Sequence, residues 1–188
     1  MSKPIKLLRH LSTPSGIPTP WVRVARQGEI LRITYRIPGD TSMVDLPKRI
    51  EPFVKRSGQR RADRLWEHTC FEAFIRAGDG SGYFELNFSP SSEWGSYEFD
   101  DYRSGMRNAD IDPPAVHPTA WQNRFELSAR VVLPPVCKNL PWRLNLTAVI
   151  EERDGTKSYW ALSHPPQGPP DFPHPACFTL ELPPPSEA

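Results

Sequence analysis

Residues 65–76, LWEHTCFEAFIR, combine side chains that serve in metal binding, nucleophilic catalysis and ligand recognition. His68 and Cys70 have the chemistry of a base and a nucleophile. Side chains two positions apart on a strand, however, stand about 6 to 7 Å apart, whereas a nucleophile must lie within hydrogen-bond reach of its base. His68 does not begin the HExxH helix of a zinc protease either, because Thr69 follows it. The pattern favours a strand of a binding site over a reaction centre.

Alternation along this strand assigns its side chains to two faces of a sheet. The face directed at the core carries Thr69, Phe71, Ala73 and Ile75, and the other carries His68, Cys70, Glu72 and Phe74. The turn GDGS predicts a hairpin with the following run YFELNFSP. In that run Phe84, Leu86 and Phe88 are expected to face the core. Glu85 and Asn87 are therefore expected on the same face as Glu72.

Glu72, Glu85 and Asn87 are predicted to form the polar floor of a site. Trp66 before the first strand and Trp94 after the second would be its aromatic walls. An aromatic face covers the apolar side of a sugar ring, while carboxylate and amide groups pair with its hydroxyls in fixed directions. Polar groups that are costly to leave unpaired then supply specificity. These residue types predict a site for a sugar or similar polyol, and the alternative is an ordinary exposed strand face.

The segment SPSSEWGSYEFDDYRSGM adds two further candidates. Tyr102 offers a stacking surface, and Arg103 offers a bidentate donor for a carboxylate, a phosphate or a vicinal diol. The alternative is that Arg103 pairs with Asp100 or Asp101 of the same segment.

Proline indicates which elements must position these residues. The chain has 23 prolines in 188 residues, and a helix interior tolerates proline badly. Besides the hairpin above, strands are expected in residues 21–25, 29–37, 124–133 and 142–152 and in the runs YWALSH and CFTLEL. The pattern predicts an all-β, antiparallel two-sheet β-sandwich with little helix. The one helix candidate, residues 45–57, contains two prolines.

The length is typical of one globular domain. Residues 1–20 are expected to form an N-terminal arm, either free or packed on the sandwich, residues 21–182 the single β-sandwich ligand-binding domain, and residues 183–188 a frayed tail. The formal net charge is +1, so no overall field attracts nucleic acid or an anionic membrane. Three cysteines without metal-finger spacing indicate reduced thiols. The N-terminus has no apolar stretch of signal-peptide length, and a cytoplasmic protein is expected.

Five segments together resemble a known family: LWEHTCFEAFIR, YFELNFSPSSEWGSYEFDDYRSGM, WRLNLTAVIEE, SYWALSHP and PDFPHPACFTLEL. In that order they resemble the DOMON-like domains related to family 9 carbohydrate-binding modules, over about residues 7–182. The resemblance implies a β-sandwich with a concave ligand face. It also implies a stand-alone bacterial protein from a superfamily whose members bind sugars or haem.

The same resemblance places the strand of Glu72, the strand of Glu85 and Asn87, and Trp94 on the ligand face. The late segment with Trp160 and the loop to His174 match a C-terminal pattern of tryptophan, loop and phenylalanine. The second aromatic wall is left open among Trp66, Tyr102 and Trp160. The chain departs from the sugar modules in lacking their secretion signal.

The sequence thus predicts a non-catalytic domain that binds a small ligand, most simply a carbohydrate, without a cofactor. Three alternatives stay open. Haem would need Met106 with His68, His117 or His164 as axial ligands. A glycosidase would use Glu72 and Glu85 as acid and base. A third possibility is a sandwich that serves protein interaction. A zinc site at His164, His174 and Cys177 would lack a fourth ligand.

Overall fold

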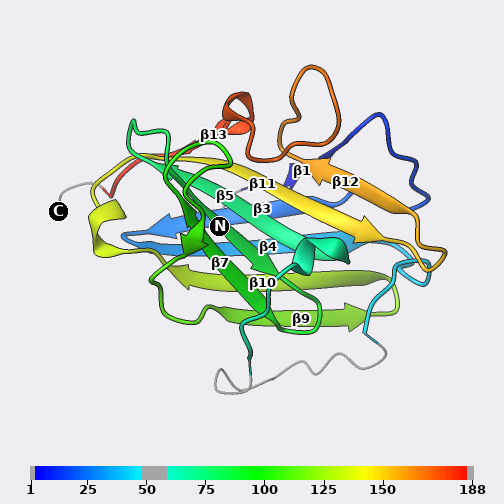
Figure 1. Ribbon diagram of the computed structural model, residues 1–188. Helices are drawn as coiled ribbons and strands as arrows, with labels where there is room; N and C mark the ends of the chain where they lie inside the picture. The colour runs from blue at the N-terminus through cyan, green and yellow to red at the C-terminus, as the bar shows by residue number, and fades with distance from the viewer. Residues whose placement is uncertain (1–2, 48–58, 186–188) are drawn as a thin grey trace.

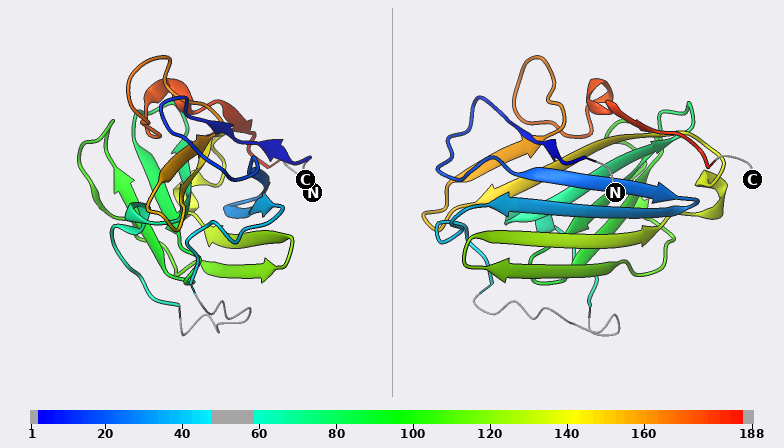
Figure 2. Two further views of the ribbon diagram at one scale, coloured as in Figure 1. Left: turned by 90° about the vertical axis from the view of Figure 1, so that its right-hand side faces the viewer. Right: turned by 180° about the vertical axis from the view of Figure 1, so that it is seen from behind.

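The computed structural model describes residues 3–47 and 59–185, and it is a sandwich of two antiparallel sheets. The back sheet has five strands in the order β1-β3-β4-β10-β9. These are β1 (Ile5–Lys6), β3 (Trp21–Gln27), β4 (Ile30–Pro38), β10 (Arg124–Val132) and β9 (Ala115–Trp121). Figure 1 shows this sheet behind the other, and the right-hand view of Figure 2 shows it from its outer side.

The front sheet has eight strands in the order β2-β12-β11-β5-β6-β7-β8, with β13 pairing β11. Its strands are β2 (Leu8–Arg9), β12 (Lys157–Ala161), β11 (Trp142–Glu151), β5 (Cys70–Ala77), β6 (Tyr83–Phe88), β7 (Trp94–Phe99), β8 (Arg107–Asn108) and β13 (Leu180–Leu182). The two-sheet, all-β class expected from the sequence is confirmed.

The core between the sheets follows the predicted alternation. Phe71, Ala73 and Ile75 of β5 and Phe84, Leu86 and Phe88 of β6 all lie in this core. The same is true of Leu144, Leu146, Ala148 and Ile150 of β11. The β5–β6 hairpin pairs Glu72 with Asn87 and Phe74 with Glu85, which puts all four on the outer face of the front sheet.

That outer face carries a second apolar cluster, unlike the half-solvated sheet of a simple sandwich. Its members are Phe74, Tyr83, Tyr97, Phe99, Val149, Ala161, Phe172 and Phe178. The C-terminal segment after β12 supplies Phe172 and Phe178 and folds back over the sheet. The central strands of the front sheet are therefore buried on both faces, which explains their nearly continuous burial.

The N-terminal segment contributes to both sheets. β1 pairs with β3 of the back sheet, and β2 pairs with β12 of the front sheet. Leu7 between them is 1% exposed and belongs to the inter-sheet core. The segment thus joins the two sheets at one side of the sandwich.

Helix is confined to single turns in the described ranges 3–47 and 59–185. These are the 3-10 helices η2 (Leu65–Glu67), η3 (Pro135–Cys137) and η4 (Pro175–Cys177). Of the helix candidate 45–57, residues 45–47 are not helical and the rest lie outside the described residues. No helix in the described part of the chain is both long and apolar enough to cross a membrane.

Candidate functional site

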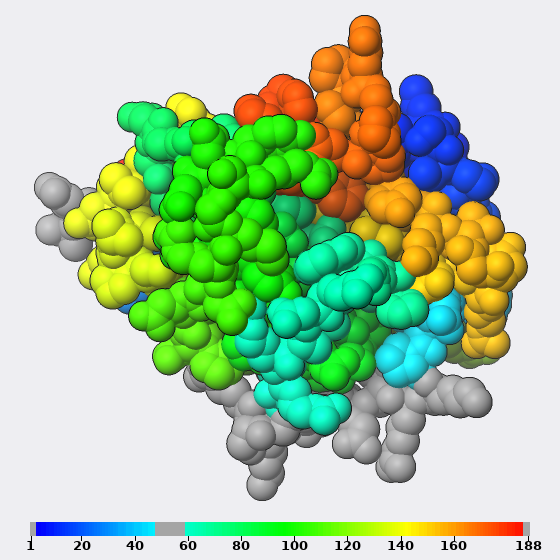
Figure 3. Space-filling view, in the orientation of Figure 1, coloured from blue at the N-terminus to red at the C-terminus, as the bar shows by residue number. Residues whose placement is uncertain are grey.

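A pocket of about 450 Å³ opens on the outer face of the front sheet. It lies among η2, the loop that joins β7 to β8, and the loop that follows β12. In Figure 3 the hollow is framed by the teal, green and orange to red atoms of these three segments. Its lining consists of Trp66, Glu72, Phe74, Tyr83, Glu85, Phe99, Arg103, Met106, Val149, Tyr159, Pro170, Phe172 and Pro173.

The polar floor comes from three adjacent strands. The register sets Thr147 of β11 opposite Glu72 of β5, and Glu72 opposite Asn87 of β6. The Thr147 hydroxyl donates to Glu72 Oε2 at 3.0 Å, and the Asn87 amide nitrogen donates to Glu85 Oε1 at 3.0 Å. Glu72 is 2% exposed and Asn87 is fully buried. Thr147 and Asn87 thus orient the two carboxyl groups.

Burial changes the protonation of this floor. The pKa of Glu72 is raised to about 8, first by desolvation and then by the nearby charge of Glu85, against the bond from Thr147. Desolvation also raises the pKa of Glu85, while the Asn87 bond and the charge of Arg103 lower it. Glu72 is therefore mainly protonated at neutral pH, and Glu85 is the better candidate for the negative charge of the floor.

Aromatic rings form the walls. Tyr83 and Phe99 stack with ring centres 4.5 Å apart and nearly parallel planes. Trp66 meets Tyr97 edge-on, with ring centres 6.0 Å apart. Phe172 is placed by Asn145 of β11, whose amide nitrogen donates to the Phe172 carbonyl at 2.9 Å. The side chain of Phe172 packs against both Phe74 and Tyr159 in the second apolar cluster.

Asp171 joins the two loops at the rim. Tyr102 Oη donates to Asp171 Oδ2 at 2.5 Å, and an Arg103 guanidinium nitrogen lies 2.8 Å from Oδ1. The main chain of Arg103 is left-handed, with φ of 53°. Arg103 was expected to clamp a ligand or to pair with Asp100 or Asp101, and it pairs with Asp171 instead. Asp100 is bonded by Arg107.

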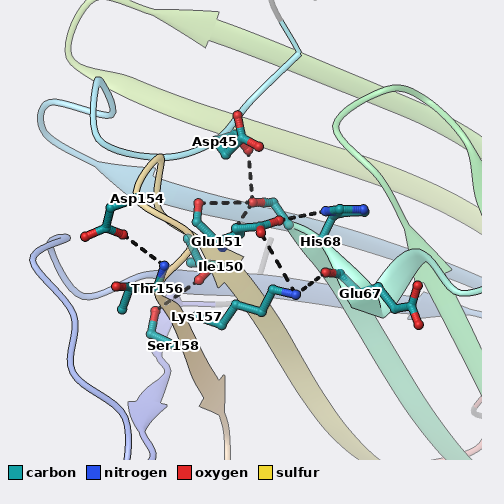
Figure 4. Close-up of polar contacts among 10 residues, drawn as sticks. Asp45, Glu67, His68, Ile150, Glu151, Asp154, Thr156, Lys157 and Ser158 are labelled. Carbon is teal, nitrogen blue, oxygen red and sulfur yellow. Dashed lines mark hydrogen bonds and ion pairs between the residues drawn. The ribbon is translucent and has the colours of Figure 1, made fainter.

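Polar contacts also hold the turn that carries Trp66. His68 Nδ1 lies 2.7 Å from Glu151 Oε2, at the end of β11. The Lys157 ammonium group donates to the carbonyl of Glu67 and lies 3.9 Å from Glu151 Oε1. Figure 4 shows these groups converging on Glu151. His68 therefore positions η2 and is not part of the pocket lining.

The structure brings together half of the residues predicted for the site. Trp66, Glu72, Glu85 and Arg103 line the pocket. Asn87 lies beside them and bonds Glu85, and Tyr102 lies at the rim through Asp171.

Trp94 and Trp160 are not part of this pocket, contrary to the predicted stacking wall. They are 7% and 4% exposed and belong to the inter-sheet core. Trp94 pairs with Phe88 and Trp160 with Ala148, both core-facing positions. Cross-strand partners point to the same side of a sheet, so the pairing directs both indole rings inward.

Several lining residues were not singled out from the sequence. Val149 and the supporting Thr147 lie on the face of β11 opposite Leu146 and Ala148, so strand alternation could have found them. Phe172 and its neighbouring prolines lie in a loop without periodic signal. Only the tertiary fold brings that loop over the sheet.

The haem and zinc alternatives find little support in the geometry. Met106 lines the pocket, but His68, His117 and His164 do not. His164 Nε2 lies 2.8 Å from the Leu8 carbonyl, and His174 Nδ1 accepts the main-chain N–H of Ala176. The described residues contain no cluster of metal-binding side chains. The pocket residues therefore do not fit haem with a histidine ligand.

Comparison with known proteins identifies the fold. No family model matches the sequence, and no curated protein matches it. Among solved structures, a candidate carbohydrate-binding protein from Bacteroides uniformis ATCC 8492 is similar, with a TM-score of 0.61 and 14% sequence identity. The match covers 94% of this chain and 83% of that chain.

A family 9 carbohydrate-binding module from Caldicellulosiruptor kristjanssonii, determined in complex with glucose, is more distant. Its TM-score is 0.47 at 8% identity, over 81% of this chain and 70% of that chain. The first match, at 14% identity, shows that the chain shares the fold of the Bacteroides uniformis protein.

Proposed function

We propose that the pocket on the front sheet binds a small carbohydrate or a similar polyol and performs no covalent chemistry of its own. The observation that carries this proposal is the buried carboxyl group of Glu72 at the floor of an aromatic-walled pocket. Thr147 already bonds one oxygen of this carboxyl group, the group retains further hydrogen-bonding capacity for a sugar hydroxyl, and the rings offer apolar surface to the C–H faces of a sugar. The fold shared with a candidate carbohydrate-binding protein is consistent with the proposal.

The shape of the outer face favours a small ligand over a protein partner. Side chains from η2 and from two loops rise around the carboxyl floor and enclose a concave space. Small-molecule sites are typically concave and mostly apolar, with a few placed polar groups. The sequence also resembles DOMON-like domains, which implies a concave ligand face. We propose that the outer face of the front sheet is that ligand face.

Tryptophan fluorescence tests the proposal, because Trp66 is the one tryptophan in the pocket lining. We expect a saturable change when the protein is titrated with glucose, galactose or xylose. Trp66→Ala should remove this signal and weaken binding measured by calorimetry about tenfold, from the lost stacking contact. Trp121→Phe is the control, because Trp121 is a half-exposed residue of β9 on the back sheet. Absence of saturable binding to any sugar would contradict the proposal.

The uneven protonation of the floor favours one second candidate, glycoside hydrolysis. A protonated Glu72 has the state of a general acid. Desolvation raises the pKa of Glu85, while the Asn87 bond and the Arg103 charge favour the ionised form that a nucleophile or base requires. Hydrolysis of aryl glycosides that is lost in Glu72→Gln, in protein that still binds sugar, would support this candidate. A wild-type protein that hydrolyses no aryl glycoside would exclude it.

A further inference from the structure

The floor of the pocket has more hydrogen-bond acceptors than donors. The Thr147 hydroxyl donates to Glu72, and one N–H of the Asn87 amide donates to Glu85. The amide oxygen of Asn87 is buried and has no partner among the described residues. Glu72, which is mainly protonated at neutral pH, offers its carbonyl oxygen as an acceptor, and Glu85 offers its second carboxyl oxygen. The floor is therefore suited to a group that donates several hydrogen bonds.

The charge of the lining points the same way. Arg103 is the one cationic side chain among the lining residues. Its guanidinium group is already paired with Asp171 at the rim, where Tyr102 donates to the same carboxylate. Neither Glu72 nor Glu85 forms an ion pair with a cationic side chain in the described part of the chain. The charge of Arg103 thus favours the ionised form of Glu85 from a distance, and among the described residues no cationic side chain is in direct ion-pair contact with the floor.

The walls are compatible with a positive charge. Trp66, Tyr83 and Tyr159 border the floor with aromatic rings, and the faces of such rings attract ammonium groups. An ammonium group has three N–H donors and no acceptor. It satisfies the excess acceptors, and its charge offsets the cost of holding a carboxylate in a partly dry site.

We infer that the preferred ligand is an amino sugar, whose protonated primary amine forms an ion pair with Glu85 and donates a hydrogen bond to Glu72 while its ring lies among the aromatic walls. This inference rests on the proposed function, since it assigns the class of carbohydrate that the same site selects. Glu85 and Glu72 are then the residues that determine specificity for the charged ligand over the neutral one.

Calorimetric titration of the full chain at pH 6.5 with three matched sugars tests the inference. Glucosamine carries the ammonium group, glucose lacks it, and N-acetylglucosamine has it capped. We expect glucosamine to bind at least about tenfold more tightly than the other two. Added salt should weaken glucosamine binding and leave glucose binding nearly unchanged, because salt screens the charge pair.

Variants identify the carboxylate that is responsible. Glu85→Gln should bring the affinity for glucosamine down to about that for glucose and should remove the salt dependence of glucosamine binding. Glu181→Gln is the matched control, because Glu181 is exposed on β13 and does not line the pocket. If Glu85→Gln does not fold, the salt dependence of wild-type binding still tests whether glucosamine binds through a charge pair.

The possible outcomes distinguish a failure of the amino-sugar inference from a failure of the proposed carbohydrate site. Binding of glucose or N-acetylglucosamine equal to or tighter than that of glucosamine would overturn the amino-sugar inference and leave the carbohydrate site standing. Salt-independent binding of glucosamine would also overturn it. No binding of any of the three, or of the neutral sugars above, would remove both.

Discussion

At the scale of single residues, Glu72 is the most strongly buried carboxyl group on the outer face of the front sheet, and its pKa is raised. Its carboxyl group lies between Thr147 and Asn87 on neighbouring strands and is almost excluded from water. A carboxylate in such a place is destabilised unless it is paired. The folded protein therefore retains a proton there that the unfolded chain gives up.

The stability of the protein should depend on pH through this proton. The pKa of Glu72 is about 8 in the folded protein against an ordinary value of 4.5, so the folded state binds the extra proton between these pH values. The free energy of unfolding must then fall as pH rises from about 4.5 to about 8, by up to about 1.4 kcal/mol for each pH unit. Above that window the contribution is constant.

Glu72→Gln should flatten this dependence, because its side chain does not titrate. We expect the variant to be more stable than the wild type at pH 8 and to differ less from it at pH 5. Urea unfolding of both proteins at several pH values measures the difference. Parallel pH profiles for the two proteins would show that Glu72 keeps an ordinary pKa.

At the scale of elements, the N-terminal segment is the clearest case of a small element with a large role. β1 and β2 have two residues each, yet they pair with different sheets. Leu7 between them inserts its side chain into the shared core, and its main-chain N–H donates to the Pro20 carbonyl at 2.9 Å. The segment expected to be an arm, free or packed on the sandwich, thus pairs with both sheets and contributes to the closure of the sandwich.

Leu7 and Leu8 provide a matched pair of variants. Leu7→Ala should lower the free energy of unfolding by about 2 to 5 kcal/mol, as is usual for a buried leucine. Leu8→Ala should change it by less than about 0.5 kcal/mol, because Leu8 is 58% exposed. Chemical unfolding followed by circular dichroism compares them. Equal effects of the two substitutions would mean that the segment does not insert into the core.

The same elements show what the sequence could and could not predict. Alternation assigned the faces of β5, β6, β10 and β11 correctly, because each strand carries apolar residues at every second position. Alternation was not extended to the pairing of β7 with β6, and Trp94 was therefore assigned to the ligand face. Its cross-strand partner is Phe88, which was already assigned to the core, so the pairing places Trp94 in the core as well. Phe172 lies in a proline-rich loop whose position depends on long-range contacts such as the one from Asn145.

At the scale of the whole molecule, the pocket depends on segments that are far apart in the chain. The turn η2, the β7–β8 loop and the loop after β12 meet only because the front sheet brings them to one face. Asp171 is the residue through which the second and third of these segments contact each other by hydrogen bonds and an ion pair.

Asp171→Asn should separate these loops without unfolding the protein. Main-chain amides near Arg103 and near Phe172 should exchange with solvent faster, whereas the free energy of unfolding should fall by only about 1 kcal/mol, since the contacts are at the surface. Hydrogen exchange detected by mass spectrometry measures both loops. Asp100→Asn is the control, because Asp100 bonds Arg107 within the hairpin and should leave the loop around Phe172 unchanged. Unaltered exchange in Asp171→Asn would show that the contacts of Asp171 do not hold the two loops together.

In the front sheet, which is apolar on both faces, alternate residues of the same strands have different roles: one set packs in the core and the other lines the pocket. Along β5 and β6, residues such as Ala73 and Leu86 face the interior, while Glu72, Phe74, Tyr83 and Glu85 face the pocket. We expect a library that randomises only these pocket positions to alter the proposed ligand preference and to keep the core residues that determine the fold. The proposed ligand preference and the fold thus depend on different positions of the same two strands.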